Sequence, residues 1–494
     1  MEHSKELTGK SFLKKLIGFS MASWLSAAIS FLITPVFTRL YSPADVGHIN
    51  LFTTYMTFFQ TVCVLALDQA FMRFYNESLS GLNKNNFLRY CLKINLGISA
   101  ASAIIILGGY RFFSMQITQS ESIEIPICLV IVILCSTFLR MSSISSRMEN
   151  NVFQYTLQIL LITIVEKVLC TLIAFYKADY KLAIVSITAG YILLSVIFFC
   201  LKRKSALLPC KHVPRDTTLT ILKFSIPYLP VLLLAWLNTS IPLIVLRNYV
   251  DYSAVGIYTN AVTIANILTI IQTGFSAYWS PFIYEHYKEE NNKAKIQKIE
   301  RSVVVVLFCA SIGIVLFQDI IYLLVGEKFR ASKIFFPLLM LTPICNSIAD
   351  MTGIGIMLSR KSYLNIFTFI TNTSVNLLCS YILIPRIGMM GAGIAVGASA
   401  LSMLTVRTLL GERYYKISPN NRFIVFSIGI MLLVCVTNII FSEQALLKYF
   451  IVLALLGIFS IIFRRDIGSL IRFVAREIQN WIHKFLFRHK KEES

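Results

Sequence analysis

Two adjacent charged residues, Glu166 and Lys167, lie in the middle of an otherwise apolar run at 156–176. A carboxylate beside an ammonium could bind a cation, hold an anionic or hydroxylated ligand, or exchange a proton. Neighbouring side chains on a helix point about 100° apart, so the two make a poor mutual ion pair. At least one of them therefore needs a partner on another helix or a watery cavity. We favour a cavity role over a buried structural pair.

Four further ionisable residues are candidates for the same chemistry. Asp350 lies in an apolar run beside other polar residues, where a functional and a structural role are equally open. Lys223 begins another apolar run; it either binds ligand or extends its ammonium to the membrane interface. Arg39 and Arg73 lie at the ends of runs, where anchoring to lipid headgroups is the simpler interpretation.

Prolines inside apolar runs predict bends. A proline removes one backbone hydrogen bond from a helix and clashes with the preceding turn, so helices bend there. Four such prolines fall in two runs that resemble each other, and we interpret them as gating or bending positions, although prolines are common in membrane helices generally. They are Pro35, Pro227, Pro230 and Pro242.

Motifs of soluble enzymes are not found. Gly9-Lys10-Ser11 resembles the end of a phosphate-binding loop, but Ser4 occupies the position of the required upstream glycine. The six histidines are scattered, and the 11 cysteines follow no metal or disulfide spacing. We therefore predict no catalytic residue, no bound metal and no cofactor.

The composition is that of an integral membrane protein. The chain has 494 residues, of which 56% are hydrophobic and only 14% are charged. Soluble domains carry about a quarter charged residues. The net charge of +21 comes from short basic clusters between apolar runs, which is typical of the cytoplasmic loops of membrane proteins and argues against nucleic acid as a partner.

Apolar runs long enough to cross a bilayer predict an all-α protein with about 14 transmembrane helices, since a spanning helix needs about 20 apolar residues. The predicted spans are 16–38, 46–67, 90–110, 123–141, 156–176, 181–201, 222–246, 255–280, 303–325, 333–358, 363–385, 389–410, 422–441 and 446–464. The last pair is short, so 12 spans is the alternative.

Loop charge predicts the orientation. With the N-terminus inside, the inner loops collect most of the Lys and Arg residues, including clusters at 202–204 and 293–301, and the outer loops are poor in them. Omitting one span would invert every later loop and destroy this asymmetry. Both termini are thus predicted to be cytoplasmic.

The chain also contains a predicted parallel repeat. Residues 35–47 and 242–256 share a proline, an arginine, an acid and a final Val-Gly, in the same order. Six spans separate them, so the two halves have the same orientation, an arrangement found in transporters whose substrate site lies between the halves. The predicted domains are two six-helix lobes at 1–215 and 216–415, an additional helix pair at 416–464, and an amphipathic basic tail at 465–494 lying on the inner leaflet.

Several segments resemble the polysaccharide-transporter branch of the multidrug/oligosaccharidyl-lipid/polysaccharide exporter superfamily, which contains bacterial flippases for O-antigen and capsule repeat units. The segments are TRLYSPADVGHINLF at 38–52, LKFSIPYLP at 222–230, VGIYTNAVTIANI at 255–267, GFSAYWSPFI at 274–283 and NLLCSYILIPRIGMMGAGIA at 376–395. The resemblance extends over about residues 10 to 410.

The resemblance implies a non-enzymatic flippase in the bacterial inner membrane that moves an oligosaccharide on undecaprenyl pyrophosphate to the outer leaflet by alternating access. An H⁺ or Na⁺ gradient, or the membrane potential, would drive it, and basic cavity residues would hold the substrate. Lys223 matches a family motif, and Arg39 and Arg73 do so more weakly. A polysaccharide polymerase and a chain-length regulator are expected partners, besides membrane lipids.

Three alternatives stay open. A multidrug/cation exporter of the same fold is expected to place several acids and few bases deep in the bundle, whereas the deep set here is mixed. A peptidoglycan-precursor flippase would share the fold. A membrane glycan polymerase is expected to need a substantial outer loop with catalytic residues, and the outer loops here are short.

Overall fold

A computed structural model describes residues 2–77, 83–202, 213–287, 293–359, 361, 363–417, 421–472 and 479. Within these ranges the chain is helical and has no strand. Twelve helices are long and apolar enough to cross a membrane, and two bent helix pairs bring the number of spans to as many as 14. The predicted all-α membrane fold is therefore confirmed, and the bent pairs account for the second and tenth predicted spans.

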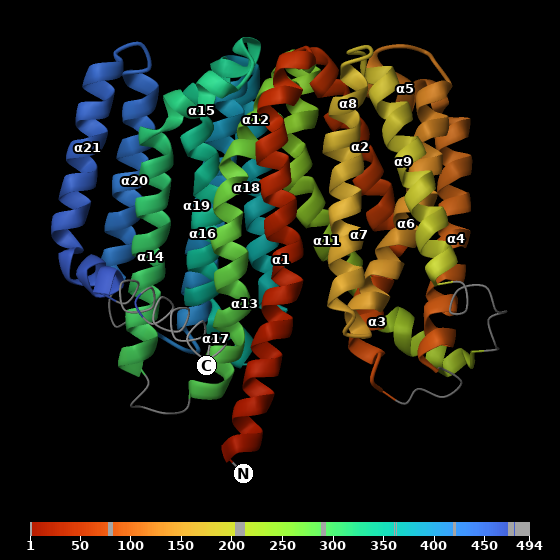
Figure 1. The fold of residues 1–494 in the computed structure, drawn as a ribbon, viewed down its shortest axis with the longest axis horizontal. Coiled ribbons are helices and arrows are strands. Elements are labelled where there is room, and N and C mark those ends of the chain that lie inside the picture. The colour runs from red at the N-terminus through yellow and green to blue at the C-terminus, as the bar shows by residue number, and fades with distance from the viewer. Residues whose placement is uncertain are drawn as a thin grey trace, which may run out of the picture.

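The helices follow one another mostly as antiparallel neighbours (Figure 1). The first half contains α1 (Glu2–Leu40), α2 (Pro43–Val64), α3 (Leu67–Phe74), α4 (Lys84–Gly108), α5 (Tyr110–Thr118), α6 (Glu124–Met148), α7 (Val152–Thr163), the π-helix η1 (Ile164–Leu169), α8 (Cys170–Ala174) and α9 (Tyr180–Leu201). The remainder contains α11 (Arg215–Tyr249), α12 (Tyr252–Ala265), η2 (Asn266–Leu268), α13 (Thr269–His286), α14 (Lys293–Leu316), α15 (Gln318–Leu324), η4 (Glu327–Ile334), α16 (Phe336–Thr352), α17 (Ile354–Leu358), α18 (Leu364–Ile387), α19 (Met389–Glu412), α20 (Arg422–Ile440) and α21 (Ala445–Ile462).

The bends in the two broken spans have local causes. Leu65 and Ala66, between α2 and α3, both adopt left-handed backbone angles, with φ of 52° and 53°. A left-handed conformation ends an α-helix, and the next helix restarts at an angle of 48°. In the other pair, η4 turns by 60° into α16, and Pro337 occupies the first turn of α16, where its missing N–H costs nothing.

The two halves meet at a reciprocal contact between α2 and α12. A Cβ atom added to Gly47 would lie 2.0 Å from the carbonyl oxygen of Tyr252, and one added to Gly256 would lie 2.0 Å from the carbonyl oxygen of Pro43. Gly47 and Gly256 are 209 residues apart, and so are Pro43 and Tyr252. Only glycine allows two helix backbones to approach this closely.

The same reciprocity extends to the capping residues and to the arginines beside this contact. Ser42 and Asp251 cap α2 and α12 with their side-chain oxygens. Arg39 donates to the carbonyl oxygen of Leu323 at 3.5 Å, and Arg247 donates to that of Met115 at 2.7 Å. Two like-oriented repeats around a central two-fold axis produce such paired contacts. The exact limits of the two lobes stay a prediction.

The last two helices are attached to the outside of the second half. α20 and α21 pack on each other and on α14, at the far end of the molecule from α4 (Figure 1). Phe308 of α14 stacks on Phe459 of α21 with ring centroids 6.0 Å apart. The chain turns back into a helix over 464–472. Most of the predicted amphipathic tail lies outside the described residues.

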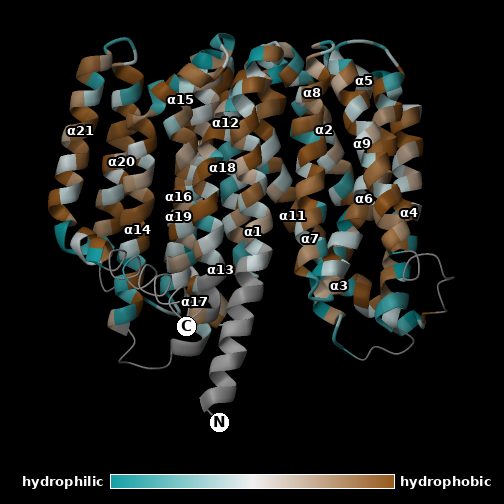
Figure 2. Cartoon of the chain, viewed as in Figure 1, coloured by the Kyte–Doolittle hydropathy of each residue, from teal (hydrophilic) through white to brown (hydrophobic). Residues whose placement is uncertain are grey.

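Apolar side chains cover much of the outer surface of the bundle (Figure 2). Many of them are more than half exposed, such as Leu32, Ile104, Leu193 and Leu446. Such a surface would aggregate in water and is stable in lipid, where backbone hydrogen bonds must be satisfied within each helix. The chain is a multi-pass membrane protein.

Candidate functional site

A cavity of about 480 Å³ lies between the two halves of the molecule. Residues of α1, α2, η1 and α9 line it from one side, and residues of α11, α12, α16 and α19 line it from the other. Many of the lining side chains carry hydroxyl or amide groups. These are Asn50, Thr53, Thr54, Thr57, Asn238, Thr239, Ser240, Tyr258, Thr259, Thr263, Asn266 and Thr342.

Glu166 and Lys167 provide the charges of this lining, and the structure brings both of them to the cavity. They lie in the π-helix η1, which interrupts the fifth span. A π-turn inserts an extra residue into the helix, so it changes the direction of the side chains that follow, and such turns are frequent at functional sites. Here the turn lets two consecutive charged residues reach one cavity.

The two charged side chains have different partners. Glu166 accepts a hydrogen bond of 2.5 Å from the hydroxyl of Tyr191 on α9, which fixes the carboxylate at the cavity wall. Lys167 makes no ion pair within the described residues, so its ammonium is available to a ligand. The arrangement provides one positioned acid and one unpaired cation in an environment of low dielectric, where charge interactions are stronger than in water.

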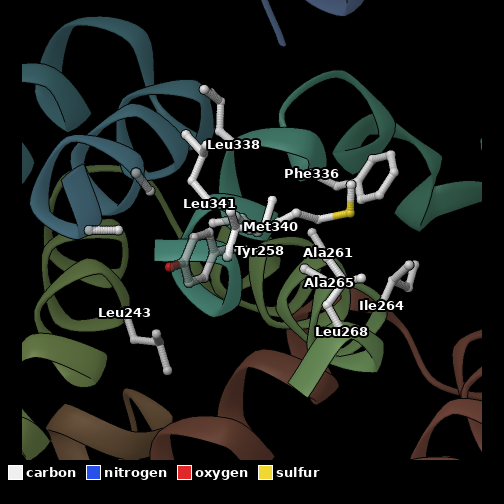
Figure 3. Close-up of a cluster of buried hydrophobic side chains, with 14 of the residues drawn as sticks. Leu243, Tyr258, Ala261, Ile264, Ala265, Leu268, Phe336, Leu338, Met340 and Leu341 are labelled. Carbon is white, nitrogen blue, oxygen red and sulfur yellow. The ribbon is translucent and has the colours of Figure 1, made fainter. Parts of the chain in front are cut away.

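Behind the polar lining of the second half lies a packed apolar layer. Tyr258 of α12 lies among Leu338, Leu341 and Met340 of α16, with Leu243 of α11 nearby (Figure 3). The ring of Tyr258 stacks on Phe335 at 6.4 Å between centroids, and the residue is 3% exposed. This apolar layer is close-packed and holds the polar residues of α12 in a fixed position.

The cavity is closed on the side where α1 ends. Asn50 donates a hydrogen bond of 3.0 Å to Thr259, one helical turn below the contact between Gly47 and Gly256. Asn50 and Thr259 are again 209 residues apart, and both line the cavity. The two halves thus seal the cavity at the face opposite the N-terminus.

Asp350 belongs to a different set of contacts. Its carboxylate lies 2.9 Å from Nη1 of Arg407 on α19 and accepts a 2.8 Å hydrogen bond from Ser276 on α13. Asp350 is not among the residues that line the cavity. Its contacts connect α13, α16 and α19 within the second half.

Lys223, Arg39 and Arg73 also lie away from the cavity lining. Lys223 is exposed on the N-terminal half of α11. Arg73 of α3 pairs with Glu77, which follows the end of this helix, and Arg39 reaches the carbonyl oxygen of Leu323. The structure therefore does not bring these three cations together with Lys167.

The four candidate gating prolines lie inside continuous helices. Pro35 lies in α1, and the other three lie in α11, which continues through Pro227, Pro230 and Pro242. The N-terminal part of α11 packs on the first half, where Tyr90 donates to Thr218 and Phe74 contacts Phe224. Farther along α11, Asn238 accepts from Asn376 of α18 in the second half. Pro227 and Pro230 lie between these two sets of contacts, so the role in gating stays a prediction.

Sequence analysis missed the uncharged polar residues of the cavity. Asn50, Asn238 and Thr259 sit in apolar helices, and single Thr or Asn residues there are too common to single out. A usable signal was the spacing of Thr259 and Thr263, and of Thr53 and Thr57, four residues apart on one helix face. Among the described residues, no group of three or more His, Cys, Asp or Glu could hold a metal ion.

Comparison with known proteins identifies the family and the fold. The model of the family described as "Polysaccharide biosynthesis protein" matches residues 12–275, more than half of the chain. No curated protein matches the chain.

Solved structures with the same fold include three transporters. The lipid II flippase MurJ in an inward closed conformation has a TM-score of 0.63 and 15% identity, covering 91% of this chain and 100% of that chain. An inward-facing multidrug resistance MATE family transporter of the MOP superfamily has a TM-score of 0.61 and 15% identity, covering 81% and 97%. The MATE multidrug transporter DinF-BH has a TM-score of 0.57 and 12% identity, covering 83% and 96%. The chain belongs to the polysaccharide biosynthesis protein family and has the fold of the MOP-superfamily transporters.

Proposed function

We propose that this protein is a flippase that moves oligosaccharide repeat units of O-antigen or capsular polysaccharide, linked to undecaprenyl pyrophosphate, from the cytoplasmic to the outer leaflet of the bacterial inner membrane. The observation that carries the proposal is the cavity between the two halves, which is lined by hydroxyl and amide groups around one cation and one acid. The family match to polysaccharide biosynthesis proteins supports the choice of a glycan.

The chemistry of the lining suits an oligosaccharide. Asn and Thr side chains both donate and accept hydrogen bonds, as sugar hydroxyls do. The cavity volume of about 480 Å³ is within the usual range for a small-ligand site, about 300–1,000 Å³. Lys167 would pair with a phosphate or an acidic sugar, while the polyprenyl chain stays in the bilayer.

Alternating access gives the closed contact a role in transport. Because Gly47 and Gly256 hold α2 and α12 together on one side, substrate leaves through that side only after these helices separate. Bending of α11 at Pro227 and Pro230 would accompany the change. Binding of H⁺ or Na⁺, with Glu166 as the acid, or the membrane potential would supply the drive.

The positive-inside distribution of Lys and Arg supports two cytoplasmic termini, so the closed face points outward in this proposal. A polysaccharide polymerase and a chain-length regulator are the proposed protein partners, since they would consume the flipped units.

The proposal is tested by reconstituting the purified protein in vesicles with a labelled undecaprenyl-pyrophosphate oligosaccharide and measuring how fast the glycan becomes accessible to an added glycosidase. Lys167→Ala should slow flipping about tenfold or more, because a hydrogen bond to a charged group contributes about 1.5–3 kcal/mol. The matched control is Lys361→Ala, which removes an exposed ammonium that lies over the ring of Tyr414, away from the cavity. Wild-type vesicles that flip no lipid-linked oligosaccharide would refute the proposal; equal rates in wild type and Lys167→Ala would refute the role of Lys167.

Two other functions of the same fold are distinguished by the same vesicles. Transport of lipid II in place of the oligosaccharide would identify a peptidoglycan-precursor flippase, and efflux of an organic cation would identify a multidrug exporter. Glu166 in the cavity lining favours a cationic substrate, and Lys167 beside it argues against one.

A further inference from the structure

A second pocket lies on the outer surface of the first half, between α4, α6 and α9. Its volume is about 450 Å³. Along α4 the lining residues follow one stripe with helical spacing, from Arg89 and Lys93 to Leu96 and Ser99. Leu134, Thr137 and Phe138 of α6 and Phe199 of α9 complete its walls. The pocket is separate from the cavity between the two halves and shares no residue with it.

The charge of this pocket is positive at one end. Arg89 and Lys93 are one helical turn apart near the start of α4, on the membrane face that carries the N-terminus. No Asp or Glu is among its lining residues within the described part of the chain. Beyond the two cations the walls are apolar, and Phe138 contacts Phe199 with ring centroids 6.0 Å apart.

Two buried hydroxyl groups lie deeper in the same pocket. Ser99 is 2% exposed and Thr137 is 4% exposed, and neither hydroxyl has a hydrogen-bond partner among the described residues. Buried polar groups are almost always hydrogen-bonded in folded proteins. Lys93 and Ser99 are separated by six residues, or about 9 Å along the helix. A ligand with an anionic head and polar groups just below it would pair with the cations and provide hydrogen-bond partners for the two hydroxyl groups.

The corresponding surface of the second half is covered by protein. Lys84 and Lys293, the first residues of α4 and α14, are 209 residues apart, the same offset as between Gly47 and Gly256. With this offset Ser99 corresponds to Phe308, which stacks on Phe459 of α21, and Leu92 corresponds to Arg301, which lies over the ring of Phe423 of α20. Helices α20 and α21 therefore occupy, on α14, the place that is left open on α4.

Exposure shows the same difference. Leu96 of α4 is 63% exposed, whereas its counterpart on α14, Val305, is 2% exposed. In the described part of the chain no helix pair covers the first half in this position, which leaves the pocket open to lipid. The cations at its mouth favour a lipid with a negative headgroup, in the way that basic pockets between membrane helices bind anionic headgroups.

We propose that this pocket binds one anionic glycerophospholipid of the leaflet next to the N-terminus, with its phosphate at Arg89 and Lys93, its glycerol and ester region at Ser99 and Thr137, and an acyl chain along Phe138 and Phe199. The lipid takes the structural place that α20 and α21 take in the second half. The proposal does not depend on which substrate the central cavity carries.

The test is native mass spectrometry of the full chain in detergent, with phosphatidylglycerol and phosphatidylcholine of identical acyl chains added in equal amounts. The wild type should retain phosphatidylglycerol preferentially, and Arg89→Gln combined with Lys93→Gln should lower this preference about tenfold, since each cation near an anionic headgroup contributes favourably. The matched control is Lys298→Gln combined with Arg301→Gln, which removes the same charge from the same level of α14 and should leave the preference unchanged.

A second variant tests the pocket without changing its charge. Leu96→Trp should fill the pocket from an exposed position and also reduce retention of phosphatidylglycerol. The proposal is overturned if the charge-removing pair or Leu96→Trp binds phosphatidylglycerol as well as the wild type does, or if the control pair loses as much binding. It is also overturned if an equal amount of a polyprenyl phosphate displaces phosphatidylglycerol from the wild type.

Discussion

The centre of the molecule and its periphery differ in how closely the two halves match. At the centre, Gly47 and Gly256 contact each other's helices at the same distance, and Ser42 and Asp251 cap these helices in the same way. At the periphery, α14 is covered by α20 and α21, whereas the matching surface of α4 borders an open pocket. Residues on the axis must fit the partner half, so each constrains the other, while residues away from the axis meet no such requirement.

The two halves also differ in the charges that they bring to the cavity, although both contribute to its walls. Both halves provide hydroxyl and amide groups, but its acid and its cation come from η1 in the first half. The fifth span of the second half, α18, contains one charged residue, Arg386, in its last turn. Two similar halves thus build a chamber in which one half supplies the charges and the other supplies only uncharged groups.

The largest expected effect comes from breaking the central contact. Gly47→Ala would place a methyl group 2.0 Å from the carbonyl oxygen of Tyr252, and neither helix backbone can move aside without separating α2 from α12. Overpacking of this kind costs about 1–3 kcal/mol or more. We expect flipping in vesicles to fall at least tenfold.

Two further substitutions sharpen this prediction. Gly256→Ala should have a similar effect, because it meets the carbonyl oxygen of Pro43 at the same distance. Gly97→Ala is the control, since a Cβ there would meet no atom within 4 Å. Normal flipping by Gly47→Ala, or an unequal response of the two central glycines, would show that the contact is not shared evenly by the two halves.

The sequence predicted the fold well because the membrane restricts what a chain can do. Backbone groups in lipid must be paired within each helix, so apolar runs translate directly into spans. The break between α2 and α3 was not predicted, because Leu and Ala, the residues at 65 and 66, do not favour the left-handed angles found there. Glu166 and Lys167 stood out because charge is rare within a span.

The remaining candidate residues show where sequence reasoning reaches its limit. Asp350 is as unusual in sequence as Glu166, yet it pairs with Arg407, 57 positions away, and no local pattern reveals such a partner. The π-turn that brings Glu166 and Lys167 to one cavity packs against α9, and no local sequence pattern marks it either.

A smaller effect is expected from two ion pairs that connect helices within each half. Asp68 of α3 accepts two hydrogen bonds from Arg140; the side chain of Asp68 is 3% exposed and that of Arg140 is 46% exposed. Asp350 and Arg407 are 28% and 23% exposed. Removing one partner of a fully buried pair costs about 3–5 kcal/mol, and a partly hydrated pair costs less. Asp68 also accepts two hydrogen bonds from Gln69, whereas Asp350 accepts one more, from Ser276. We expect Asp68→Ala to lower the free energy of unfolding by about 2 kcal/mol, and Asp350→Ala by about 1 kcal/mol.

Chemical or thermal unfolding in detergent measures this difference, and flipping by the folded fraction provides the second readout. If Asp350→Ala lost flipping while it kept its stability, Asp350 would have a role in transport. The ranking itself would be wrong if Asp350→Ala unfolded more easily than Asp68→Ala.

The smallest effect concerns the attachment of α20 and α21 at the face opposite the N-terminus. Asp319, beyond the end of the span at Ala294–Leu316, contacts Lys333, Tyr449 and Lys448. Burial alone would raise the pKa of Asp319, but hydrogen bonds from Lys333 and Tyr449 and the charge of Lys448 outweigh it and lower the pKa below its ordinary value of 3.8. The group therefore stabilises the fold above about pH 4, and this contribution is lost as the pH falls through the lowered value.

Because the Asp319 side chain is 39% exposed, its net contribution is expected to be about 1 kcal/mol. Asp319→Asn should remove this stabilisation at neutral pH. Hydrogen exchange in α21 should then be faster than in the wild type at matched intrinsic exchange rates. The stacked rings of Phe308 and Phe459 should keep the helix pair attached, so exchange in the rest of the chain should not change. If Asp319→Asn leaves hydrogen exchange in α21 unchanged while Phe459→Ala speeds it, the prediction is wrong. Apolar packing on α14 alone would then hold α20 and α21 in the place that lipid occupies on α4.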